Sequence, residues 1–199
     1  MKYVIIAILF LTVIVSNAQN DSCLNAFVLT KNSLNHKGIF VLSSWAGITI
    51  AGSATGYALT NSYEEKQFYM MNGAWGIINL GIALPALLSK PKAYSSLYQT
   101  QKDQTKTEKI FLANALLDVV YITGGVALYQ YAENQTDRKQ QQFRGYGNAI
   151  ILQGAGLLIF DTAMTLLNNK NRKQRLDNIL KNARISFTGN TVKLGYTFN

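Results

Sequence analysis

Residues 38–59, GIFVLSSWAGITIAGSATGYAL, decide the fold, because they contain no charged side chain. The uncharged run is bounded by Lys37 and Glu64. A helix needs about 20 apolar residues to cross the hydrocarbon core of a bilayer. Helices of soluble domains rarely stay apolar over such a length. The sequence therefore predicts a membrane-spanning helix over about residues 38–61.

Three further stretches have the same character. Residues 67–89 are uncharged, and residues 110–132 and 145–168 each contain a single charged residue. Hydrophobic residues make up 48% of the chain and charged residues only 15%, well below the roughly 25% of soluble domains. We therefore predict one all-α domain, a four-helix transmembrane bundle over residues 19–169, in contact with the lipid bilayer.

The first 18 residues have the pattern of a cleavable signal peptide. A basic residue, Lys2, precedes an apolar run over residues 4–15 and the small-residue end Ser16-Asn17-Ala18. Cleavage is expected before Gln19, and the alternative is an uncleaved fifth helix. The sequence thus predicts an exported, multi-pass protein of the bacterial inner (cytoplasmic) membrane.

The C-terminal segment, residues 170–199, is basic and changes its periodicity. Over residues 170–184, apolar residues at helical spacing alternate with Lys and Arg, which predicts an amphipathic helix on anionic lipid. A charged continuation of the fourth helix is the alternative. Residues 185–198 alternate with a period of two, which predicts a short β-hairpin that pairs Phe187 with Val192.

Two signals for membrane orientation disagree. A cleaved signal peptide places Gln19 outside the cytoplasm, and four spans return the C-terminus to the same side. However, Lys and Arg are concentrated on that side, at the two termini and in residues 90–109, which are predicted to form the loop between the second and third spans. The positive-inside tendency would place those segments in the cytoplasm. We give more weight to the signal pattern.

Small residues predict how the helices associate. Lipid gives helices little hydrophobic reason to pack, so close approach depends on small side chains. The same faces would also allow a homo-oligomer. A weak internal repeat relates the two halves, two helical hairpins displaced by about seventy residues. The candidate packing positions are Gly52, Gly56, Gly76, Gly125 and Gly154.

Two aspartates inside predicted spans, Asp118 and Asp161, are the candidate functional residues. Ionisable groups within a membrane span are costly, which makes them candidates by default. One hypothesis is that they belong to hydrogen bonds between helices, each contributing about 0.6 kcal/mol. The other is a proton- or cation-linked site. Residues on the same helical faces complete the candidate polar site: Asn72, Asn79, Asn114, Tyr121 and Gln153.

Other function classes are disfavoured. His36 is the single histidine, so neither a histidine-centred triad nor a multi-histidine metal site can form. We expect no enzymatic activity, no metal and no cofactor. The net charge of +9 does not predict nucleic-acid binding, because the basic residues flank membrane segments and lack interleaved aromatic residues.

Several short motifs resemble those of an uncharacterised family of bacterial envelope proteins, a domain of unknown function. They are Leu117-Asp118, Gly124-Gly125, Gly145-Tyr146-Gly147, Gln153-Gly154 and Phe160-Asp161. The resemblance implies a signal peptide, four helices and no assigned activity. We expect a structural or assembly-related role. The alternative is a small proton- or cation-linked transporter or channel subunit that uses Asp118 and Asp161.

A topology reporter tests the predicted orientation. Alkaline phosphatase fused after Asn199 should be active, because the signal pattern places the C-terminus outside the cytoplasm. A green fluorescent protein fusion at the same position, which is fluorescent when cytoplasmic, is the matched control and should be dark. A fluorescent fusion with an inactive phosphatase would reverse the orientation.

Overall fold

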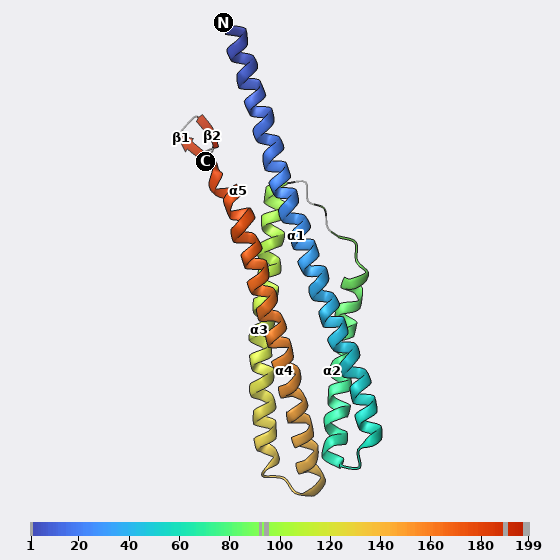
Figure 1. Cartoon of the computed structure of the whole chain (residues 1–199). Helices are drawn as coiled ribbons and strands as arrows, with labels where there is room; N and C mark the ends of the chain where they lie inside the picture. Colours follow the sequence, from blue (N-terminus) through green and yellow to red (C-terminus); the bar gives the residue numbers. More distant parts are fainter. Residues whose placement is uncertain (1, 92, 94–95, 189–190, 197–199) are drawn as a thin grey trace.

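The computed structural model describes the chain except residues 1, 92, 94–95, 189–190 and 197–199, and describes side chains within residues 22–179. Four long helices dominate it: α1 (Lys2–Leu59), α2 (Tyr63–Leu88), α3 (Leu97–Ala132) and α4 (Asp137–Asn171). A π-helical turn (Arg172–Leu176) and α5 (Asp177–Asn182) continue α4 (Figure 1). The predicted cleavage position lies inside α1, and the signal peptide stays a prediction.

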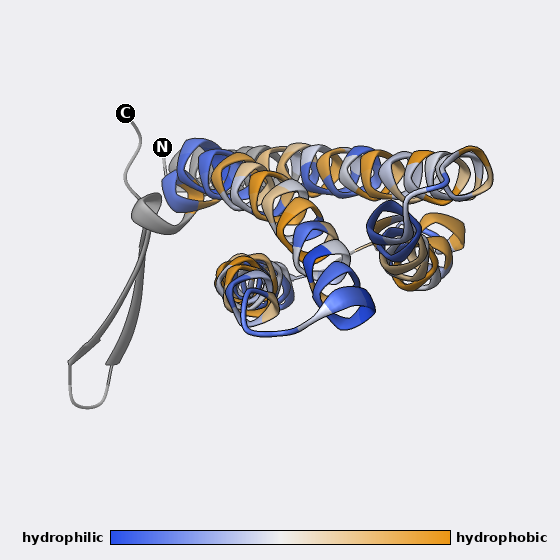
Figure 2. Cartoon of the chain, turned by 90° about the horizontal axis from the view of Figure 1, so that it is seen from below, coloured by the Kyte–Doolittle hydropathy of each residue, from blue (hydrophilic) through white to orange (hydrophobic). Residues whose placement is uncertain are grey.

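Four helices of the described part of the chain are long and apolar enough to cross a membrane. Large apolar side chains point outward from all of them, including Ile48 (71% exposed), Ile77 (64%), Leu116 (63%) and Ile159 (73%). Figure 2 looks along the bundle from the end with the two short connections. It shows hydrophilic residues at those connections and many hydrophobic ones along the helices. An apolar exterior of this extent is typical of a lipid-facing surface.

Serine residues start the second and third helices. Ser62 is the N-cap of α2, and its side chain accepts a 3.4 Å hydrogen bond from the Glu65 amide. Ser96 caps α3 through a 3.2 Å bond from the Gln99 amide. Such caps satisfy amides that have no partner within the helix. The turns are therefore encoded locally.

The helices pair as two hairpins, α1 with α2 and α3 with α4 (Figure 1). Helix α4 also packs against α2 and α1, so it contacts the other three long helices. The N-terminal end of α1 and the C-terminal end of α4 lie at the same end of the molecule. This arrangement is the predicted all-α four-helix bundle.

Glycine allows the closest approach within the first hairpin. A Cβ atom on Gly76 of α2 would lie 3.2 Å from the carbonyl oxygen of Ala46 and 2.8 Å from Cγ1 of Ile50, both on α1. Such distances leave no room for a side chain, so the two backbones touch where glycine occurs.

The second hairpin repeats this contact. A Cβ atom on Gly154 of α4 would lie 3.1 Å from the Asp118 carbonyl oxygen and 2.9 Å from Cγ1 of Ile122. The interval along the chain from Ala46 to Asp118 equals that from Ile50 to Ile122. The two hairpins are therefore structural repeats, which the sequence showed only weakly.

The remaining candidate glycines differ in their surroundings. Gly125 faces Gly147, and a Cβ on Gly125 would lie 2.9 Å from the Gly147 carbonyl oxygen. Gly56 lies directly against the ring of Tyr69. Gly52 is exposed, and a Cβ there would meet nothing within 4 Å. The Gly-x-x-x-Gly element on α1 thus packs within this chain through Gly56 and not through Gly52.

Three helices extend beyond the end of α2, which stops at Leu88, three residues after Pro85. The sequence predicted a polar loop before residue 110, but α3 begins at Leu97. Helix α1 extends before residue 38 and α4 continues past 168 in the same way. These polar segments are helical because they pack against one another as a three-helix extension of α1, α3 and α4 (Figure 1).

The C-terminal segment corrects the predicted fold class. Residues Ala183–Thr188 (β1) and Thr191–Tyr196 (β2) form an antiparallel pair with Phe187 opposite Val192. The turn at residues 189–190 lies outside the described residues. The main helix contact of the pair is with α5, and two strands alone are marginally stable. The fold class is therefore all-α, and the predicted β-hairpin is not part of it.

Substitution of adjacent glycines tests the α3–α4 contact. Gly125→Ala should lower the free energy of unfolding by about 1–3 kcal/mol, because the added methyl group meets a backbone oxygen. Gly124→Ala is the matched control, since a Cβ there meets nothing within 4 Å. Thermal unfolding of the purified protein in detergent measures both. Equal melting temperatures would contradict the proposed contact.

Candidate functional site: the polar interior

A single amide, Gln153 of α4, ties three helices together. It is 1% exposed, and its Nε2 donates a 2.7 Å hydrogen bond to Oδ1 of Asn72 on α2. Its Oε1 accepts from Asn79 Nδ2 at 3.4 Å and from Trp45 Nε1 of α1 at 3.2 Å. Polar groups in an apolar interior need such partners. Gln153 is thus the hub of the polar interior.

The helices position these partners by their spacing. Asn72 and Asn79 are seven residues apart, so they lie two turns apart on one face of α2. Trp45 reaches the hub because Gly156 makes room for its ring, and a Cβ on Gly156 would lie 2.9 Å from Cζ2 of Trp45. The sequence grouped the three amides, whereas Trp45 as their partner was missed.

Asp118 of α3 and Asp161 of α4 lie beside each other in the second hairpin. They are 3% and 4% exposed, and their carboxyl groups are close enough to interact. Nδ2 of Asn114 lies 3.5 Å from Oδ1 of Asp161. Among the described residues, Oδ2 of Asp118 has no hydrogen-bond partner. The arrangement is a buried carboxyl pair with one unsatisfied oxygen.

Tyr121 lies beside this pair rather than in it. Its half-buried ring packs edge-on against Trp75 of α2, with ring centroids 5.0 Å apart. Aromatic contacts of this geometry add about 0.5–1.5 kcal/mol. The structure therefore separates the predicted polar site into an amide hub around Gln153 and a carboxyl pair at Asp118 and Asp161.

The first hairpin shows what the carboxyl pair replaces. The intervals that match Ala46 with Asp118 and Gly76 with Gly154 also match Ala83 with Asp161. Ala46 and Ala83 are both fully buried. The same backbone contact is thus built with alanine in one repeat and with aspartate in the other. Packing alone does not require the carboxyl groups.

The polar interior continues into the three-helix extension. Gln104 of α3, fully buried, donates from Nε2 to the carbonyl oxygen of Asn168 on α4 at 3.2 Å. Nδ2 of Asn168 donates to Oδ1 of Asn35 on α1 at 3.4 Å. Gln104 was not among the predicted site residues, since it lies in the segment predicted as a loop.

An ion pair and a small apolar cluster hold the helices of the extension together. Lys31 is 1% exposed and forms an ion pair with Asp103. The apolar cluster is Phe27, Val28 and Leu176. Two features of the sequence could have indicated this packing, the apolar Phe27-Val28 pair and the charged Lys31. However, a polar segment does not indicate which distant residues it contacts.

Basic residues of the predicted lipid-binding tail take part in the extension. Nε of Arg172 lies 2.8 Å from Oε1 of Glu108. Arg175 donates to the carbonyl oxygen of Ala26 at 3.2 Å and also bonds the Thr30 hydroxyl. Residues 170–176 thus continue the fourth helix. The sequence left two alternatives, an amphipathic helix on the lipid surface and a charged continuation of the fourth helix. The geometry of residues 170–176 agrees with the second.

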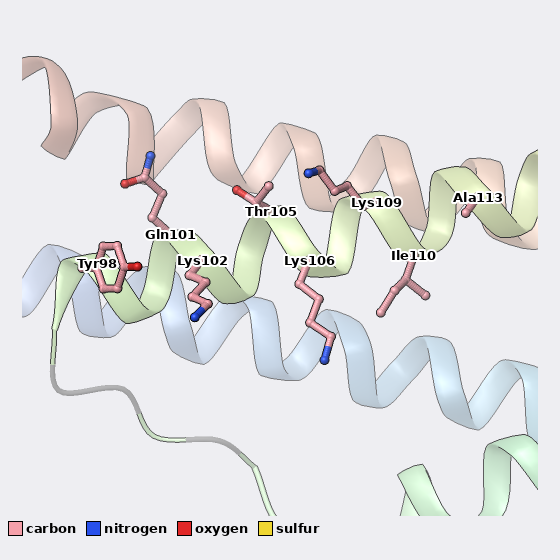
Figure 3. Close-up of a pocket in the computed structure, with 8 residues that line it drawn as sticks. All are labelled: Tyr98, Gln101, Lys102, Thr105, Lys106, Lys109, Ile110 and Ala113. Carbon is pink, nitrogen blue, oxygen red and sulfur yellow. The ribbon is translucent and has the colours of Figure 1, made fainter.

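Among the described residues, two cavities lie at the level of the extension. One, about 180 Å³, lies between α1, the end of α2 and α3, and His36 and Lys90 are among its lining residues. The other, about 630 Å³, is open and lies on the outer face of α3 (Figure 3). Within the described residues, no three His, Cys, Asp or Glu side chains converge as a metal site would require.

These features define the class, an all-α bundle of four helices long enough to cross a membrane, with a polar interior. Residues 41–162 match DUF6992, a family of unknown function, and the chain belongs to that family. The predicted resemblance to an uncharacterised family is confirmed. No curated protein and no solved structure matches the chain. The matched residues include the amide hub and the carboxyl pair.

Replacement of the hub residue tests its role. Gln153→Leu should lower the free energy of unfolding by about 1–3 kcal/mol, since it leaves buried partners on α1 and α2 unsatisfied. Gln141→Leu, an exposed position on the same helix, is the control and should change stability little. Thermal unfolding in detergent measures both. A Gln153→Leu protein as stable as the control would contradict the hub.

Proposed function

We propose that the chain is a structural protein of the bacterial envelope, a four-helix membrane anchor that holds a rigid three-helix extension at the membrane surface. The observation that carries this proposal is the fastening of α4 to every other long helix. In the bundle it is fastened through Gln153 and Gly154, and in the extension through Asn168 and Arg172. A framework fixed at both levels suits a scaffold.

The proposed location follows from the sequence and the helix lengths. The signal pattern favours export and insertion into the inner membrane. Helix α3 has 36 residues, about 54 Å at 1.5 Å per residue, whereas the hydrocarbon core is about 30 Å thick. The excess length supports a position of the extension in the headgroup region and beyond, where an assembly partner could reach it.

The carboxyl pair supports a second candidate, a proton- or cation-linked transporter or channel subunit. Among the described residues, Asp118 has a buried oxygen without a partner, as do Gln67, Gln104 and Asn168, but only that of Asp118 belongs to a carboxyl group. Buried polar groups in native proteins rarely lack a partner. The first hairpin builds the same contact with alanine. A proton or small cation held between the two carboxyl groups would relieve their mutual repulsion.

A flux measurement separates the two functions. Purified wild-type protein in vesicles with an internal pH dye should pass protons no faster than protein-free vesicles, if the role is structural. The variant Asp118→Asn/Asp161→Asn should behave identically. Proton flux above that of protein-free vesicles, abolished in a variant that still folds, would establish the transporter and overturn the scaffold.

Folding and function of this variant need separate readouts. Asp118→Ala/Asp161→Ala gives the second hairpin the residues of the first, so its melting temperature in detergent should stay within a few degrees of wild type. Complementation of a deletion strain supplies the second readout. A scaffold predicts that both double variants complement when they accumulate normally, whereas normal accumulation without complementation would contradict it.

A further inference from the structure

The outer face of α3 has an open cavity lined by basic residues, which makes no contact among the described residues that holds the four-helix bundle together. It is the open cavity of about 630 Å³, and all its lining residues come from α3. Figure 3 shows Lys102 and Lys106 on one side of this stretch and Lys109 on the other, with Tyr98 at one end and Ile110 and Ala113 at the other. All six side chains are exposed. Along α3, this face thus changes from aromatic and basic side chains to apolar ones.

The depth of this face matches the lipid headgroups. Lys109 directly precedes the apolar run that begins at Ile110. Lys106 and Lys102 lie about 4.5 and 10 Å farther along the helix axis, at 1.5 Å per residue. The headgroup layer is about 5–8 Å thick on each side, and lysine side chains extend toward it. All three amines can therefore reach one phosphate level.

The charge on this face is not used inside the protein. In the described part of the chain, the ion pairs involve Lys31, Arg144 and Arg172 but none of these three lysines. The basic segment 170–184 was expected to contact anionic lipid. However, Arg172 bonds to Glu108 and Arg175 bonds to Thr30, both within the extension. Unpaired positive charge facing the headgroup layer is complementary to an anionic lipid.

We propose that this face of α3 binds one anionic phospholipid. Its phosphate lies among Lys102, Lys106 and Lys109, and an acyl chain runs over Ile110 and Ala113 into the bilayer. Tyr98, 72% exposed, lies at the polar end, where aromatic residues favour the membrane interface. The bound lipid goes beyond the anchoring role, because it fixes the height of the extension above the membrane.

Native mass spectrometry of the full-length protein in detergent tests the site with defined lipids. One molecule of phosphatidylglycerol should stay bound, and phosphatidylcholine should not. The variant Lys102→Gln/Lys106→Gln/Lys109→Gln should bind phosphatidylglycerol roughly a hundredfold more weakly, since each lysine near an anionic headgroup contributes separately. Equal retention of the two lipids, or unchanged binding by the variant, would overturn the proposal.

Two matched variants and a competitor make the result specific. Lys66→Gln/Arg138→Gln/Lys139→Gln removes the same charge at the opposite end of the bundle and should bind phosphatidylglycerol like wild type. Lys170→Gln/Lys173→Gln tests the tail and should also bind normally. Loss of binding in either variant, or displacement of the lipid by millimolar glycerol phosphate, would overturn a lipid site on α3. Circular dichroism confirms that each variant is folded.

Discussion

The contact between glycine on one helix and backbone on the next is the constraint on which the rest of the structure depends. Gly76 on α2 and Gly154 on α4 bring the helices of each hairpin to backbone contact. Because the exterior is apolar, burial of apolar surface gives little energy for this association in lipid. Dispersion between close backbones and hydrogen bonds across helices must supply it. Both need helices that approach closely, which a larger side chain at these positions prevents.

Close packing also determines where polar groups can lie. Gln153 precedes Gly154, so the same approach that seats the glycine brings the amide against α1 and α2. The hub then fixes the rotation of α4 relative to both. In the extension, where α2 has ended, Lys31 and Gln104 hold the helices together. Lys31 forms an ion pair, and the side-chain amide of Gln104 forms a hydrogen bond. The molecule is thus fastened by polar contacts along its whole length.

The two repeats share a backbone contact but differ in chemistry. Ala46 and Ala83 occupy in the first hairpin the places that Asp118 and Asp161 occupy in the second. An apolar pair is the less costly choice inside a bundle, since buried carboxyl groups lose their hydration. The difference between the repeats therefore concentrates the ionisable chemistry in α3 and α4, while α1 and α2 supply the amide partners and the aromatic rings.

By itself, the sequence determined the four apolar spans, their apolar exterior and the amides and aspartates of the polar interior within those spans. Uncharged runs of bilayer length and the period of a helix carry that information locally. Only the tertiary structure decided that Gln153 is the hub, that Gly56 packs while Gly52 does not, and that residues 97–109 are helical. This polar segment packs where Lys31, far away in the chain, forms an ion pair with Asp103. Local patterns cannot encode which distant residue satisfies a buried group, and that pairing is what the folded bundle supplies.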